Sequence, residues 1–130
     1  MPNSQRIIPL LVYEDIEAGH DFLVRAFGLR AGRIDRDDQG RVVHGEVYVG
    51  GEVVWLHRVT SKSGLISPRS QPAASGGLVV DVDDVDEHYE QARAAGARLD
   101  HPPVDQPYGR REYEARDLEG HRWWFGTPLI

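Results

Sequence analysis

The stretch EGHRWWF (119–125) decides the fold, because an earlier stretch, GGEVVWL (50–56), shows the same pattern 69 positions before it. Trp55 and Trp124 hold equivalent places in the two stretches, each four positions after a glycine. Both stretches have the composition of a turn followed by the second strand of a hairpin. One offset that holds over a turn and a strand indicates an internal repeat.

The same offset relates two predicted helix starts. Asp15 and Asp84 each precede a helical pattern, and aspartate is a preferred residue at the N-cap of a helix. Gly28 stands where the first helix would end, and Gly96 has that place in the second. We therefore interpret the chain as two copies of one supersecondary unit, each too small to bury its own apolar face.

Each copy is predicted to be a β-α-β-β-β module, which makes the fold class α+β. The two tandem modules should form a cupped mixed β-sheet with the helices on its convex face. We expect a single domain over 1–130, with module one at about 5–58, a linker at 59–76 and module two at 77–130. The linker is rich in Ser, Pro and Gly and has no periodicity, so it is either a connection or a flap over a site.

The predicted elements follow the same order in both copies. They are a strand at 7–13, a helix from Asp15 to Gly28, strands on either side of a turn at 37–40, a hairpin at 44–58, a strand at 77–82, a helix from Asp84 to Gly96, a strand that runs into a Pro-rich loop within 97–109, and a hairpin at 111–125.

Composition is that of a globular protein, with 28% charged and 40% hydrophobic residues. The chain has no cysteine, so we expect neither disulfides nor thiolate metal sites. The N-terminal segment MPNSQRIIPLLVY is neither a signal peptide nor a membrane span, which favours the cytoplasm. A formal net charge of −6 argues against nucleic acid or an anionic membrane as a partner.

Alternation along the strands sorts the hairpin residues into two faces. The aliphatic face of the first hairpin, which should pack under the helices, contains Val47, Val49, Val54 and Leu56. Its opposite face contains His44, Glu46, Tyr48, Val53, Trp55 and His57. The equivalent face of the second hairpin is predicted to contain Arg111, Tyr113, Ala115, Arg122 and Trp124. Aromatic and titratable side chains gathered on one face are typical of a cleft lining.

Three stretches resemble the vicinal oxygen chelate superfamily, which groups glyoxalase I, the extradiol dioxygenases and the bleomycin-resistance proteins. They are IPLLVYEDIEAGHDFLVRAFGL, VVDVDDVDEHYEQARAAGARL and PYGRREYEARDLEGHRWWFGTP. The most specific piece is the turn at 117–121, which is similar to the family's Asp-Pro-x-Gly-[Asn/His] turn, with Leu118 where proline is usual. The resemblance covers nearly the whole chain and implies two β-α-β-β-β modules around a cleft.

The enzymes of this superfamily hold a divalent metal with a His or Glu near each of four strand positions. The resemblance maps these positions to Ile8, Trp55, Gly77 and Trp124. None of these side chains can ligate a metal. We therefore expect no metal and no cofactor, and the resemblance points to the metal-free branch of bleomycin-resistance and related antibiotic-sequestering proteins.

The leading hypothesis is a metal-free protein that sequesters a small aromatic or peptide-like antibiotic, for drug resistance or producer self-protection. The predicted ligand-binding residues are Trp55, Trp124, Tyr48, Tyr113, His44, Glu46, Arg111 and Arg122. The two tryptophans suit a flat ligand, because aromatic stacking contributes about 0.5–1.5 kcal/mol beyond burial. Core filling is the alternative role for both tryptophans.

Two enzymatic alternatives stay open. One is a metal-dependent lyase, isomerase or dioxygenase with relocated ligands, for which His44, Glu46 and His57 are the rival metal set. The other is a metal-free enzyme that uses Glu46 or His44 as a base. The resemblance also implies a homodimer with clefts at or near the subunit interface, and a sheet of this size has edges that need covering.

Overall fold

The computed structural model describes residues 6–71 and 74–129, and these residues form two four-stranded mixed sheets with one helix each. The first module contains β1 (Leu10–Tyr13), α1 (Ile16–Phe27), β2 (Arg30–Arg36), β3 (Val42–Val49) and β4 (Glu52–Arg58). The second contains β5 (Gly77–Asp81), α2 (Val85–Ala94), β6 (Arg98–Gln106), β7 (Arg110–Arg116) and β8 (Arg122–Pro128). The predicted α+β class and the two β-α-β-β-β modules are confirmed.

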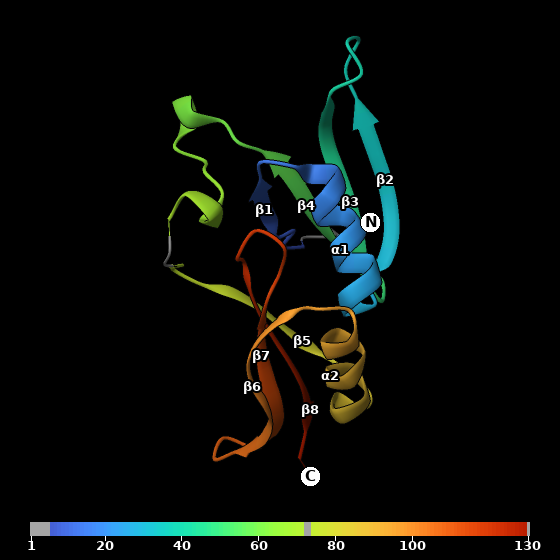
Figure 1. Ribbon diagram of the computed structural model, residues 1–130, viewed down its shortest axis with the longest axis vertical. Helices are drawn as coiled ribbons and strands as arrows, with labels where there is room; N and C mark the ends of the chain where they lie inside the picture. The colour runs from blue at the N-terminus through green and yellow to red at the C-terminus, as the bar shows by residue number, and fades with distance from the viewer. Residues whose placement is uncertain (1–5, 72–73, 130) are drawn as a thin grey trace, which may run out of the picture.

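The two sheets have the same topology, with strand orders β1-β4-β3-β2 and β5-β8-β7-β6. The first strand of each module runs parallel to the last, and the other neighbours are antiparallel. Figure 1 shows the first sheet above the second, with α1 and α2 stacked along the same side of the molecule. The two ends of the predicted domain, near residues 1–5 and at residue 130, lie outside the described residues.

Both helices begin at the predicted aspartates. The side chain of Asp15 accepts a hydrogen bond from the backbone N–H of Ala18 at 3.0 Å, and that of Asp84 accepts one from Glu87 at 3.1 Å. Gly28 ends α1 in the left-handed conformation, with φ of 71°, which only glycine adopts readily. The repeat seen in the sequence is therefore a repeat of capping chemistry as well as of pattern.

The main core crosses from one module to the other. The aliphatic face of the first hairpin packs under α1 as predicted, with Val47 and Leu56 fully buried. At the C-terminal end of α1, the ring of Phe27 lies 5.8 Å from Trp123 and 4.9 Å from Phe125, both in β8. Burying this much aromatic surface between the modules holds the two sheets together.

Strand β6 is longer than the sequence predicts. It continues through Pro102 and Pro103 to Gln106, where a Pro-rich loop was expected. The strand lies at the edge of its sheet, where one side of the strand has no ladder partner and proline is tolerated. The pairing of β6 with β7 shows register shifts on either side of His101, which accommodate the prolines.

Among the described residues, no helix has both the length and the apolar character that crossing a membrane requires.

Candidate functional site

Each sheet has one face that carries no helix, and the centre of that face has the same composition in both modules. Trp55 in β4 pairs with Glu46 in β3 on one side and with Leu10 in β1 on the other. Trp124 in β8 pairs with Glu114 in β7 and with Val79 in β5. Residues paired across strands project from the same face, so each module presents a tryptophan flanked by a carboxylate and an aliphatic side chain. We call these the helix-free faces.

The two tryptophans lie outside the core, in contrast to Trp123, which is fully buried. Trp55 is 37% exposed and its neighbour Leu10 is 42% exposed. Trp124 is half-buried, and its neighbour Val79 is 64% exposed. Both tryptophans are therefore accessible from the helix-free side of their sheet.

On the first helix-free face, Glu46 is the centre of a polar cluster. Its carboxylate accepts hydrogen bonds from His44 Nε2 at 2.8 Å and from the Tyr48 hydroxyl at 3.2 Å. The guanidinium of Arg33 lies 3.6 Å away. The hydrogen bond from His44 is the largest of the influences that lower the pKa of Glu46 below its usual value. The cluster thus holds a negative charge beside Trp55, whose ring meets the His44 ring edge-on at 5.4 Å.

On the second helix-free face, the carboxylate of Glu114 pairs with Arg122. The indole of Trp124 lies directly over Gly77, and a Cβ built on Gly77 would stand 2.5 Å from the indole atom Cζ3. Glycine at this position therefore leaves the space in which the ring lies. Alternation along the sequence puts Glu114 on the face opposite Trp124, whereas the structure pairs the two residues on the same face. The spacing of Glu114 from Glu46, one short of the offset between the tryptophans, was available as a signal.

The prediction that Arg111, Tyr113 and Ala115 share a face with Trp124 is wrong. Tyr113 pairs with Phe125 and Ala115 with Trp123, so these side chains belong to the buried, helix-facing side of β7. Strand side chains alternate between faces, so an error of one residue in register moves every side chain to the other face.

Two predicted ligand-binding residues consequently have other neighbours. The Tyr113 hydroxyl donates a hydrogen bond to His88 Nδ1 in α2 at 2.6 Å, and Tyr113 is fully buried. The guanidinium of Arg111 pairs with Asp86 at 2.9 Å and Asp105 at 3.1 Å. The structure gathers His44, Glu46, Tyr48 and Trp55 on one helix-free face, and Arg122 and Trp124 on the other.

The residues that the sequence resemblance maps to the superfamily's four metal-ligand positions do not fit a metal. The indoles of Trp55 and Trp124 and the side chains at Ile8 and Gly77 offer no donor atom. In the rival set, His44 and Glu46 are hydrogen-bonded to one another, while His57 lies near the Thr60 hydroxyl at 3.4 Å. Over residues 6–71 and 74–129 the structure contains no group of three or more His, Asp or Glu side chains placed to hold a metal.

The described part of the linker, residues 59–71 and 74–76, connects the two sheets. It borders a cavity of about 480 Å³ together with β1 and β5, and an adjoining cavity of about 350 Å³ at the β7–β8 turn. Ser67 is buried and donates a hydrogen bond to Glu119 at 2.5 Å. The sequence offered a flap as one of two interpretations of this segment, but nothing in its local pattern marked Ser67 or Glu119.

The family model described as "Glyoxalase/Bleomycin resistance protein/Dioxygenase superfamily" matches residues 7–125. An uncharacterized protein of Mycobacterium bovis is 32% identical over an alignment of 127 positions that covers 93% of this chain and 82% of that protein.

Solved structures share the whole arrangement. TioX from Micromonospora sp. ML1 is 32% identical, with a TM-score of 0.74 over 97% of this chain and 98% of its own. A lactoylglutathione lyase from Agrobacterium tumefaciens is 22% identical, with a TM-score of 0.68 over 98% of this chain and 96% of its own, and this likeness concerns the fold alone. The duplicated module, the matched helix-free faces and these similarities agree, and the chain belongs to the glyoxalase/bleomycin resistance protein/dioxygenase superfamily.

Proposed function

We propose that this protein binds and sequesters a small planar aromatic or peptide-like antibiotic without using a metal. The observation that carries the proposal is the matched pair of helix-free faces, each with an accessible tryptophan beside a carboxylate. Flat rings stack on tryptophan with little loss of side-chain entropy, and the neighbouring charges can orient a ligand. The family that the chain belongs to includes bleomycin resistance proteins, which supports an antibiotic as the ligand class.

An enzymatic role has less support from the same residues. The four metal-ligand positions of the superfamily carry no donor atoms, so a metal-dependent reaction would need a new ligand set. The lowered pKa of Glu46 makes its carboxylate a weaker base than an ordinary glutamate, which works against general-base catalysis at this position.

A fluorescence titration tests the binding proposal. A bithiazole- or quinoline-bearing peptide antibiotic should quench tryptophan emission on binding. Trp55→Ala and Trp124→Ala should each weaken binding by about 1–4 kcal/mol, as truncation of an aromatic anchor does. Val24→Ala, which removes apolar volume from the helix side, is the matched control and should bind like the parent. If both tryptophan variants bound the antibiotic as tightly as the parent protein, the proposed stacking walls would be refuted.

A metal analysis tests the metal-free part of the proposal. Purified protein should carry no stoichiometric Zn, Ni, Mn or Fe, and a chelator should leave its melting temperature unchanged. One tightly held equivalent of any of these metals would favour the metal-dependent alternative instead.

We further propose that two copies of the chain associate through their helix-free sides. Leu10, Trp55 and Val79 expose apolar surface there, and Ile66 on the linker is 41% exposed. A two-fold dimer would cover this surface and could build a cleft from two chains. Light scattering should give twice the mass of the chain at micromolar concentration, whereas a monomer would contradict the assembly.

Location in the cytoplasm stays a prediction from the sequence.

A further inference from the structure

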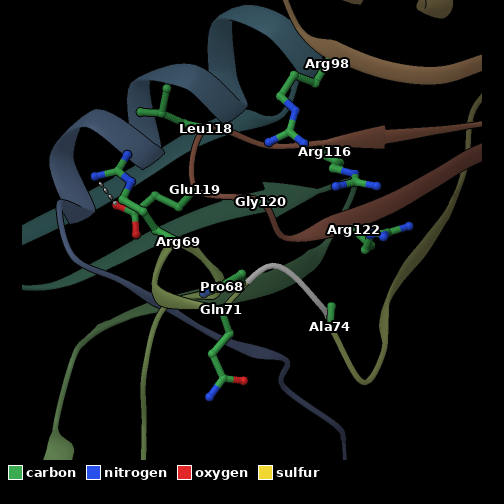
Figure 2. A pocket seen from close by; sticks show the side chains of 10 residues that line it. All are labelled: Pro68, Arg69, Gln71, Ala74, Arg98, Arg116, Leu118, Glu119, Gly120 and Arg122. Atoms are coloured by element: carbon green, nitrogen blue, oxygen red, sulfur yellow. Dashed lines mark ion pairs between the residues drawn. The ribbon is translucent and has the colours of Figure 1, made fainter.

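A row of three arginines crosses the second helix-free face at its end nearest the linker. Arg98 in β6 pairs with Arg116 in β7, which pairs in turn with Arg122 in β8. All three line the cavity of about 350 Å³, and Figure 2 shows them on neighbouring strands, with Arg69 of the linker on the other side of the cavity. Like charges directly opposite one another on a sheet are destabilising unless something of opposite charge lies between them.

The acidic residues nearby only partly compensate this row. Arg116 pairs with Asp100 at 3.3 Å and Arg122 with Glu114, but neither acid lines the cavity. Arg98 has no ion pair within 4.0 Å among residues 6–71 and 74–129. The row therefore carries surplus positive charge in a chain whose formal net charge is −6.

Among the described residues, Glu119 is the one acidic residue that lines this cavity, and its carboxylate already accepts several hydrogen bonds. One oxygen accepts hydrogen bonds from the backbone N–H of Glu14 and the hydroxyl of Ser67, at 2.8 and 2.5 Å. The other accepts one from the backbone N–H of Asp15 at 2.9 Å and lies 4.0 Å from Arg69. A carboxylate that is buried and committed in this way cannot turn to neutralise the row on the far side of the cavity.

The cavity lies next to the proposed stacking wall. Arg122 pairs with Gly77, and the indole of Trp124 lies over the same glycine. A ligand whose ring stacks on Trp124 could therefore extend a short acidic substituent toward Arg122 and the rest of the row. The amide of Gln71 on the linker adds a further polar group to the lining.

We propose that the arginine row binds an oxyanion, a phosphate or carboxylate group, and that the ligand of this protein carries such a group beside its ring. Guanidinium groups bind these anions through paired, charge-assisted hydrogen bonds. The part of this inference that concerns the ring rests on the proposed function. The anion site itself does not, because an anion without a ring should also bind.

Inorganic phosphate is the first probe, titrated by calorimetry at constant ionic strength with chloride as the balancing ion, because salt screens such contacts. Arg98→Gln removes the least compensated charge, and Arg116→Gln removes the centre of the row. Arg93→Gln on α2 makes the same change of charge at a helix residue away from the cavity and is the matched control. Phosphate should bind the parent and the control equally, and each row variant should raise Kd about tenfold, as loss of one charge-assisted pair does.

Phenyl phosphate and benzoate then distinguish a phosphate from a carboxylate, and Trp124→Ala separates the anion site from the stacking wall. Trp124→Ala should keep its affinity for inorganic phosphate and lose affinity for the ring-bearing probe. If Trp124→Ala binds phenyl phosphate as tightly as the parent, and Arg98→Gln binds it more weakly, the anion site is supported and the stacking wall is refuted. If phosphate does not bind the parent, or binds both row variants as tightly as the control, the oxyanion site is overturned.

Discussion

At the scale of single residues, Gly77 determines where the wall formed by Trp124 can lie. The Cβ of any larger residue would meet the carbonyl oxygen of Arg122 and the indole of Trp124 at less than ordinary contact distance. The glycine lies in β5 without a positive φ, so its role here is close approach rather than an unusual backbone conformation.

Gly77→Ala should therefore displace the indole and overpack this face. We expect a loss of about 1–3 kcal/mol in the free energy of unfolding, together with a shift of tryptophan emission. Gly76→Ala is the control, because a Cβ there meets nothing within 4 Å. Urea unfolding followed by fluorescence measures both effects. If Gly77→Ala and Gly76→Ala had the same free energy of unfolding and the same tryptophan emission, the indole would be free to move.

At the scale of elements, the turn between β7 and β8 ties three parts of the chain together. Asp117 accepts hydrogen bonds from the Tyr13 hydroxyl at the end of β1 and from the Trp123 indole at 3.2 Å. Two residues later, Glu119 binds the backbone ahead of α1 and the linker residue Ser67. The turn that carries the family resemblance is thus the point at which the second module holds the first module and the linker.

Ser67→Ala should release the linker from this turn. Loss of a buried hydrogen bond to a charged group should cost about 1–3 kcal/mol, because one acceptor on Glu119 loses its hydroxyl partner. The linker contains Lys62 and Arg69, so limited trypsin digestion should cut it faster in this variant than in the parent. Ser63→Ala, at an exposed linker serine, is the control, and an unchanged cleavage rate in Ser67→Ala would mean that other contacts hold the linker.

At the scale of the whole molecule, His88 connects the two modules through a half-buried imidazole. Its Nε2–H donates to the carbonyl oxygen of Phe27 at 2.8 Å, where α1 ends, and its Nδ1 accepts from Tyr113 at 2.6 Å. The ring also lies 4.2 Å from that of Phe125. Burial lowers the pKa of His88 below its usual value, because the interior disfavours the charged imidazolium.

The stability of the protein should consequently fall as the solution is acidified through about pH 6.5, the usual histidine pKa. Below that pH the unfolded chain binds a proton at His88 that the folded chain does not, so protonation favours unfolding. Urea unfolding at a series of pH values gives the free energy of unfolding as a function of pH. In His88→Gln this free energy should change less steeply with pH than in the parent. Tyr113→Phe leaves the imidazole half-buried against Phe27 and Phe125 and should keep most of the parent's dependence of the unfolding free energy on pH. An NMR titration that gave His88 an ordinary pKa would contradict this account.

Local pattern was enough to predict the features that depend on neighbours in the chain. The repeat, the aspartate caps and the two faces of the first hairpin follow from capping chemistry and strict alternation, and the structure has Asp15, Val47 and Leu56 where these rules put them. Trp55 and Trp124 were placed at equivalent positions for the same reason, because both follow a tight turn at a fixed distance.

Only the tertiary structure decided how distant strands pair. The register of β7 against β8 assigned Tyr113 to the core and Glu114 to the side of Trp124, and an alternating strand looks equally plausible in either register. The edge pairing of β6, with its prolines, set Arg98 opposite Arg116, and folding of the linker brought Ser67 to Glu119 across 52 positions of sequence. Such contacts depend on long-range packing, which hydrophobic periodicity and turn chemistry do not encode. The repeated module depends on local rules, and the sequence alone was sufficient to reveal it.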